Sequence, residues 1–126
     1  MSVGMPQTLL LQEFGEHVHR AFGHVCYHVG SSLKEKGGWR DVDVRLILPD
    51  DEYARMELGD PAHPQHNKRW VSLVLAWSSF GKQLTGLPID FQIDRQADVN
   101  AQTKGQIRVA LGLWAISSDG TGRRET

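Results

Sequence analysis

Apolar and polar residues alternate sharply in two stretches of the chain, and this alternation predicts two β-strands. In residues 42–48 the apolar side chains recur at every second position, with Asp43 and Arg45 between them. Residues 87–94 repeat the pattern, with Asp90 among the polar positions. Because successive side chains of a strand point to opposite faces, each strand would bury an apolar face and present a charged one.

Two longer segments show helical periodicity instead. In the first, apolar residues recur at every fourth position, with Thr8 as the predicted N-cap and Gly23 as the end. This predicted stripe consists of Leu10, Phe14, Val18 and Phe22. The second segment, residues 68–84, carries Trp70 and Trp77 on its apolar face, and we interpret both tryptophans as core residues.

Shorter elements complete the predicted fold. They are strands at residues 25–29 and 107–113, a short helix at 50–58, and a polar loop at 95–105 that could include one helical turn. Amphipathic helices combined with a few strands predict an α+β fold, a small mixed β-sheet with helices packed mainly on one face. With 126 residues the chain fits one domain, residues 1–116, followed by a flexible C-terminal tail at residues 117–126.

Composition narrows the function classes. The net charge of −1 gives no general attraction to nucleic acid. The single cysteine, Cys26, cannot form an internal disulfide and lies in a predicted buried strand, so we interpret it as a packing residue rather than a nucleophile. No leader sequence is apparent, and no apolar stretch is long enough to span a bilayer. We therefore expect a cytoplasmic protein with no membrane partner.

Three aspartates on the polar strand faces are the candidate chemistry. Asp41 and Asp43 would point the same way, about 7 Å apart along the strand, and Asp90 would join them if its strand pairs beside the first. Ionised carboxylates this close repel one another unless a cation neutralises them, and Mg²⁺ prefers oxygen ligands supplemented by substrate phosphates. Three such carboxylates would suit two metal ions, the arrangement used for in-line nucleotidyl displacement.

A turn sequence precedes these aspartates at a defined distance. Gly30-Ser31 is followed by nine residues, then by Asp41-Val42-Asp43-Val44, and later by the strand that carries Asp90. This combination resembles the polymerase-beta-like nucleotidyltransferase superfamily, particularly its minimal single-domain members, over residues 26–93. The resemblance implies a nucleotidyltransferase-like fold for that part of the chain.

The resemblance also implies an activity and roles for the residues that match. Gly30 and Ser31 would contact the phosphates of a nucleoside triphosphate such as ATP, and Asp41, Asp43 and Asp90 would be the catalytic metal ligands. The bound metal would be Mg²⁺, as two ions, with Mn²⁺ as the alternative. The implied reaction transfers a nucleoside monophosphate from the triphosphate to an acceptor hydroxyl and releases pyrophosphate. The sequence does not identify the acceptor.

Ser32, Lys34 and Arg45 complete the predicted nucleotide-binding set. Lys34 lies in a basic connector beside the turn, which suits a triphosphate, and a solvated basic loop is the alternative interpretation. Arg45 shares the aspartate face, where the family is usually apolar, and it would either bind a triphosphate oxygen or form an ion pair with an aspartate. Arg40 stands where family members often have a small hydroxyl residue.

Parts of the sequence are consistent with other functions. The main alternative is a catalytically weak or inactive nucleotidyltransferase-fold module that binds a protein partner, as in toxin–antitoxin or regulatory pairs. A homodimer is also plausible, because a second subunit would add a wall to a shallow site. A carboxylate-based phosphohydrolase is a weaker alternative. The six histidines lack the ligand spacing of a zinc site, and Ser31 and Ser32 lack the Gly-x-Ser-x-Gly elbow of serine hydrolases.

Overall fold

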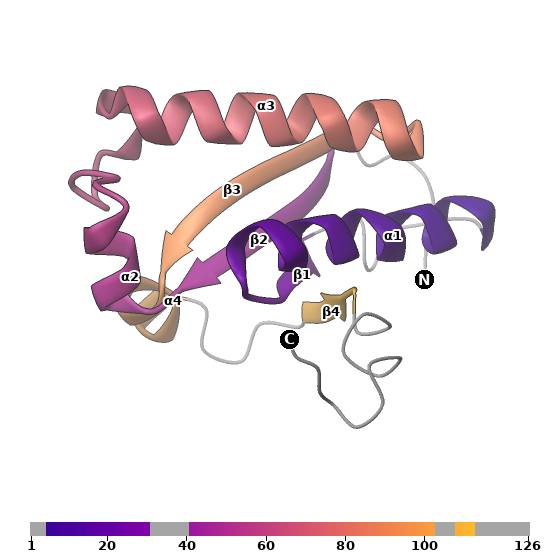
Figure 1. Ribbon diagram of the computed structural model, residues 1–126. Helices are drawn as coiled ribbons and strands as arrows, with labels where there is room; N and C mark the ends of the chain where they lie inside the picture. Colours follow the sequence, from indigo (N-terminus) through magenta and orange to yellow (C-terminus); the bar gives the residue numbers. More distant parts are fainter. Residues whose placement is uncertain (1–4, 31–40, 103–107, 113–126) are drawn as a thin grey trace.

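A computed structural model describes residues 5–30, 41–102 and 108–112 of the protein. In chain order its elements are α1 (Met5–Phe22), β1 (Cys26–Val29), β2 (Val42–Leu48), α2 (Asp50–Arg55), the 3-10 turn η2 (Pro64–His66), α3 (Lys68–Thr85), β3 (Ile89–Arg95), α4 (Gln96–Gln102) and β4 (Arg108–Leu111). Together they form an α+β fold, which confirms the predicted class (Figure 1). The predicted tail at 117–126 lies outside the described residues.

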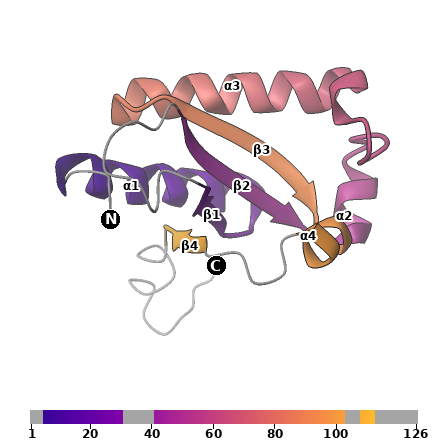
Figure 2. The ribbon, with the colours of Figure 1, turned by 180° about the vertical axis from the view of Figure 1, so that it is seen from behind.

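The four strands form one mixed sheet in the order β3-β2-β1-β4. The pairing of β2 with β3 is parallel, whereas β1 pairs antiparallel with both β2 and β4. The long helices α1 and α3 lie side by side and cover one face of this sheet, as both views show (Figures 1 and 2). The other face carries the charged side chains of β2 and β3, so we refer to it as the open face. No helix in the described ranges is both long and apolar enough to cross a membrane.

Aromatic side chains fill the space between the helices and the sheet. Phe14 of α1 and Phe91 of β3 are fully buried and meet edge to face, with ring centroids 6.1 Å apart. Trp77 of α3 lies 6.2 Å from Phe14 and 5.5 Å from Phe22, also between ring centroids. Trp70 is buried as well. Trp70 is therefore a core residue, as the sequence predicted, whereas Trp77 is partly buried and packs against the core.

Two sequence-based predictions about α1 need correction. The helix extends back to Met5, so Thr8 lies within it and is not its N-cap. The buried position of its first turns is Leu11, which is 1% exposed, rather than Leu10, which is only partly buried. Leu11 precedes Phe14 by three residues, and spacings of three and four both keep side chains on one helix face.

The predicted polar loop at 95–105, for which one helical turn was allowed, also needs correction, because the seven-residue helix α4 occupies most of it. Asp50, at the start of α2, accepts a hydrogen bond from the Ala97 backbone N–H at 3.1 Å between Oδ1 and N. Arg95 and Asp98 add a two-pronged ion pair, with N to O distances of 3.0 and 3.2 Å. A backbone donor at the start of a helix has no partner within the helix, so the carboxylate from α2 stabilises α4 from outside. Local sequence did not reveal this partner.

The outer edge of β3 is occupied by side chains of α3. The Trp70 indole N–H donates to the Ile93 carbonyl at 2.9 Å, and the Phe91 N–H donates to the Ser78 hydroxyl at the same distance. These bonds satisfy backbone groups with which no further strand of the described residues pairs, and they fix α3 against the sheet.

The opposite edge depends on a close approach between α1 and β4. A Cβ on Gly15 of α1 would lie 2.5 Å from the Leu111 Cβ and 2.7 Å from the Gly112 backbone N. The Gly112 N–H donates to Gln12 Oε1 at 2.8 Å, and Gly112 has a φ of +77°. Glycine at both positions lets two backbones pass closer than side chains allow.

We expect Gly15→Ala to destabilise the protein, because the added methyl group meets backbone that cannot move without displacing β4. In an unconstrained helix the same change would stabilise by about 1 kcal/mol, whereas overpacking costs about 1–3 kcal/mol. Urea unfolding measures the difference. Gly81→Ala in α3 is the matched control, because the atoms nearest to its Cβ would belong to the Ile89 side chain, at 3.0 Å, and the change should cost less. A Gly15→Ala protein as stable as wild type would contradict this account of the edge.

Candidate active site on the open face of the sheet

The parallel pairing of β2 with β3 places Asp43 directly beside Asp90. These two residues are partners in the strand register, and their carboxylates both project from the open face. Neighbouring strands lie about 4.8 Å apart, so the two groups are close enough to interact directly. Gln92, the next residue on this face, donates from Nε2 to Asp90 Oδ1 at 3.4 Å. The predicted neighbourhood of these two aspartates is therefore present.

The backbone at the end of β1 lies against the Asp43 carboxylate. Val29 is the register partner of Asp43 on its other side, and Gly30 follows with a φ of +88°. A Cβ built on Gly30 would collide with Asp43 Oδ2, so only glycine allows the chain to turn here. Three residues of the predicted nucleotide-binding set, Ser31, Ser32 and Lys34, lie outside the described residues.

Asp43 sits in an environment that disfavours its charge. Burial raises the pKa of its carboxyl, the Arg45 guanidinium opposes that shift, and the carboxylates of Asp90 and Asp41 add to it, together with a hydrogen bond to Asp90. Asp41 immediately precedes β2 and is exposed. The cluster carries more negative charge than its single arginine balances, which is the condition in which a carboxylate site attracts a cation.

Arg45 lies among these carboxylates and does not face solvent freely. Its guanidinium is 3.9 Å from Asp43 Oδ1 and 3.9 Å from Asp94 Oδ2, measured from Nη2 and Nε. Nη1 also donates to the Asp90 backbone carbonyl at 3.2 Å. Of the two roles that the sequence left open, ion pairing with an aspartate is thus present. Both ion pairs, at 3.9 Å, are near the longest N–O distance that counts as an ion pair, so each one binds Arg45 weakly.

The residues fit a magnesium ion that takes part of its coordination from a substrate. Within the described ranges, no three or more His, Cys, Asp or Glu side chains are placed to hold a metal on their own. Asp43 and Asp90 supply two adjacent carboxylates, whereas Asp41, one strand step before them, does not join them, so the predicted set of three aspartate ligands is not formed. Mg²⁺ is commonly held by one or two carboxylates together with substrate phosphates and water rather than by a protein cage.

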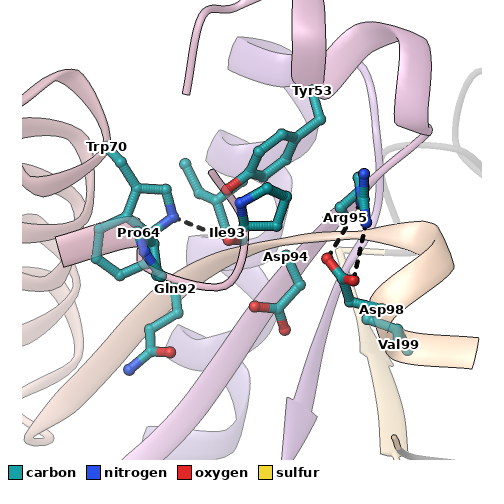
Figure 3. A pocket seen from close by; sticks show the side chains of 10 residues that line it. Tyr53, Pro64, Trp70, Gln92, Ile93, Asp94, Arg95, Asp98 and Val99 are labelled. Atoms are coloured by element: carbon teal, nitrogen blue, oxygen red, sulfur yellow. Dashed lines mark hydrogen bonds and ion pairs between the residues drawn. The ribbon is translucent and has the colours of Figure 1, made fainter. Parts of the chain in front are cut away.

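Asp94 belongs to the same charged face and was not singled out from the sequence. It lines a pocket of about 100 Å³ between β3, α4 and the segment that joins α2 to α3 (Figure 3). Burial raises the pKa of its carboxyl, Arg45 opposes this, and Asp98 adds to it. The alternation of residues 87–94 already placed Asp94 beside Asp90 on one face. Its ion pair with Arg45 depends on the register between β2 and β3, which the sequence alone does not give.

The remaining nucleophile and metal-ligand candidates have structural roles. Cys26 is fully buried, and burial raises the pKa of its thiol to about 12, which confirms that it is a packing residue. His24 bonds Glu52 at 2.8 Å between Nε2 and Oε1. His63 and His66 stack on each other with ring centroids 5.4 Å apart. Neither contact belongs to a set of zinc ligands, and the described residues contain no such set.

Comparisons with models of known protein families, with curated proteins and with solved structures found no match to this chain. The resemblance to nucleotidyltransferases therefore stays a prediction made from residues 26–93.

We expect Asp43→Asn to increase the free energy of unfolding at neutral pH. Because the pKa of Asp43 is raised in the folded protein, the native state binds this proton more tightly than the unfolded chain does, so ionisation costs stability as pH rises through the folded pKa. Asparagine removes that cost. The gain should disappear well below the ordinary aspartate pKa, where both states are protonated. Urea unfolding at several pH values tests this.

Asp51→Asn is the matched control for that experiment. Asp51 is exposed on α2, and its hydrogen bond to Arg55, 3.1 Å long, lowers its pKa. The sign is therefore reversed, and the substitution should slightly reduce stability at neutral pH. A stabilisation of equal size in both variants would point to a general charge effect and would contradict the local explanation for Asp43.

Proposed function

We propose that this protein is a magnesium-dependent nucleotidyltransferase that moves a nucleoside monophosphate from a nucleoside triphosphate to an acceptor hydroxyl. The observation that carries the proposal is the juxtaposition of Asp43 with Asp90, on an exposed sheet face and against the Gly30 backbone. Two partly desolvated carboxylates beside a tight glycine turn suit a metal–phosphate complex better than they suit a structural role, because leaving them unneutralised costs stability.

In this proposal Asp43 and Asp90 would hold Mg²⁺, with Mn²⁺ as a substitute. Asp41, at the entry to β2, would add negative charge near the ion rather than a third ligand. The bound metal would supply positive charge against the phosphates and lower the pKa of the acceptor hydroxyl. A bond forms between the acceptor oxygen and the α-phosphorus, the bond from that phosphorus to the pyrophosphate oxygen breaks, and Asp90 receives the acceptor proton. Pyrophosphate is the leaving group.

The rest of the nucleotide-binding set would hold the triphosphate. Gly30 gives the phosphates access to backbone N–H groups of the turn, and Ser31, Ser32 and Lys34 would continue that contact along the connector. Arg45 would exchange one of its long ion pairs, to Asp43 or Asp94, for a phosphate oxygen. This exchange would release Asp43 for the metal.

One observation favours a second candidate function. The guanidinium of Arg45 already occupies space beside Asp43, where a cation would bind. If that ion pair persists, the protein is a catalytically weak or inactive module of the same fold, and its function is to bind a protein partner or a second copy of the chain.

We expect wild type to bind a nucleoside triphosphate only in the presence of Mg²⁺, and Asp43→Asn to abolish that binding. Isothermal titration with each of the four nucleoside triphosphates, with and without Mg²⁺, measures this directly. Asp90→Asn should weaken the same interaction, whereas the control Asp51→Asn should leave it unchanged, because Asp51 lies on α2 and pairs with Arg55. Metal-dependent binding that survives in Asp43→Asn would contradict the proposed site.

Arg45→Gln separates the two candidate functions. If Arg45 binds phosphate, the variant should bind the magnesium–triphosphate complex roughly ten- to a hundredfold more weakly, the usual loss for one charge-assisted hydrogen bond. If instead the guanidinium blocks the metal, the variant should gain magnesium affinity. Arg45→Lys retains the charge without the planar fork and should fall between the two. A gain in Arg45→Gln would favour the inactive module.

A further inference from the structure

A second hollow lies on the open face, at the end of the sheet away from Gly30. It measures about 180 Å³ and is bordered by the start of β1, the end of β2, the first residue of α4 and the first residue of β4. Tyr27 is the register partner of Arg45, and Ile47 follows Arg45 on the same face. The hollow and the carboxylate pair are therefore two ends of one surface.

The lining of this hollow has an apolar floor and a polar rim. The floor is formed by Val25, Tyr27, Ile47 and Pro49. The rim is formed by His24, Gln96 and Arg108. His24 Nε2 already bonds Glu52 and Gln96 Nε2 already donates to Asn100, so the groups left for a ligand are His24 Nδ1, Gln96 Oε1 and the Arg108 guanidinium. Such a combination is typical of sites for small ring-shaped ligands, where apolar contacts bind the ring and a few polar groups orient it.

Arg108 gives the hollow a stacking surface. Its guanidinium carbon lies over the Tyr27 ring, 4.7 Å from the ring centroid, which is a cation–π contact. Arg108 is exposed, and among the residues the structure describes no carboxylate lies within ion-pair distance of it. Guanidinium planes and aromatic rings are the groups on which nucleobases stack in proteins, and stacking tolerates every base.

The spacing suits a nucleotide whose phosphates lie at the carboxylate pair. Tyr27 is one strand step, about 7 Å, from the row that contains Asp43 and Val29. Ile47 is two such steps away. A ribose therefore fits between the phosphates and a ring in the hollow, and Arg45 lies beneath that span.

The other hollows in the described residues suit a base less well. The pocket around Asp94 is smaller, about 100 Å³, and its Trp70 is buried with its indole N–H already bonded to Ile93. The pocket lined by His17, Ala76, Trp77 and Phe80 lies in the helix layer, across the sheet from Asp43. Of these three hollows, the Tyr27–Arg108 hollow is the one that shares the face of the aspartate pair and has a guanidinium over an aromatic ring.

We infer that the hollow formed by Tyr27, Ile47 and Arg108 binds the base of the nucleotide whose phosphates are held near Asp43 and Asp90. The inference rests on the proposed nucleotidyltransferase function and adds to it the position of the base. The base stacks against the Tyr27 ring and the Arg108 guanidinium, above the apolar floor. At the rim, His24 Nδ1 and Gln96 Oε1 are the polar atoms that would contact its polar edge, since the Nε2 atoms of both residues already bond Glu52 and Asn100.

The test compares whole nucleotides with the phosphate chain alone. Wild type, Tyr27→Leu and Tyr27→Phe are each titrated with the magnesium complexes of the four nucleoside triphosphates and of inorganic tripolyphosphate. Tyr27→Leu should weaken binding of the preferred nucleoside triphosphate about ten- to a hundredfold, the usual loss for one stacked base. It should leave tripolyphosphate binding unchanged. Tyr27→Phe keeps the ring and should behave as wild type.

The possible results separate this inference from the proposed function. Unchanged tripolyphosphate binding by Tyr27→Leu also shows that the variant folds and retains the phosphate site. If Tyr27→Leu binds both probes as wild type does, or loses both equally, the base does not lie in this hollow and the inference is wrong, while the metal–phosphate site stands. If wild type binds neither probe, the proposed function itself is wrong, and the inference with it.

Discussion

The parallel pairing of β2 with β3 is the contact on which the rest of the structure depends. Parallel neighbours need a connection that returns across the sheet, and here α3 makes that return and covers one face. The register sets Val44 beside Phe91 in the core and Asp43 beside Asp90 on the open face. A slip of one residue would exchange these faces, so the buried aromatic core also fixes the geometry of the carboxylates.

Much of this arrangement could be predicted because it follows from patterns of apolar and polar residues within short segments of the chain. Strict alternation identified β2 and β3 and assigned their faces correctly, and α3 was predicted to within a residue of its observed bounds. The approach of Gly30 to Asp43 agrees with the Gly-Ser and Asp-x-Asp spacing. In α1 the pattern was ambiguous, because Leu10 and Leu11 both continue an apolar stripe and only packing against the sheet decides between them.

The features that sequence could not predict all join residues distant along the chain. The helix α4 relies on a carboxylate, Asp50, that lies 47 positions before the amide it accepts from. The Arg45 to Asp94 contact joins two neighbouring strands, and the cation–π contact of Arg108 with Tyr27 requires β4 to pair with β1. Each of these contacts appears only after the register is set, so no window of local sequence contains it.

The occupied edge of β3 limits how this protein can assemble. A strand from another molecule extends a sheet by bonding to backbone groups that are still available, yet on this edge the Ile93 carbonyl and the Phe91 amide are already bonded to Trp70 and Ser78. Sheet extension between copies at β3 would first have to detach α3 from the core. Trp70 and Ser78, which hold α3 against the sheet, therefore also prevent edge-to-edge pairing at β3. A partner that extends the sheet would have to bind elsewhere.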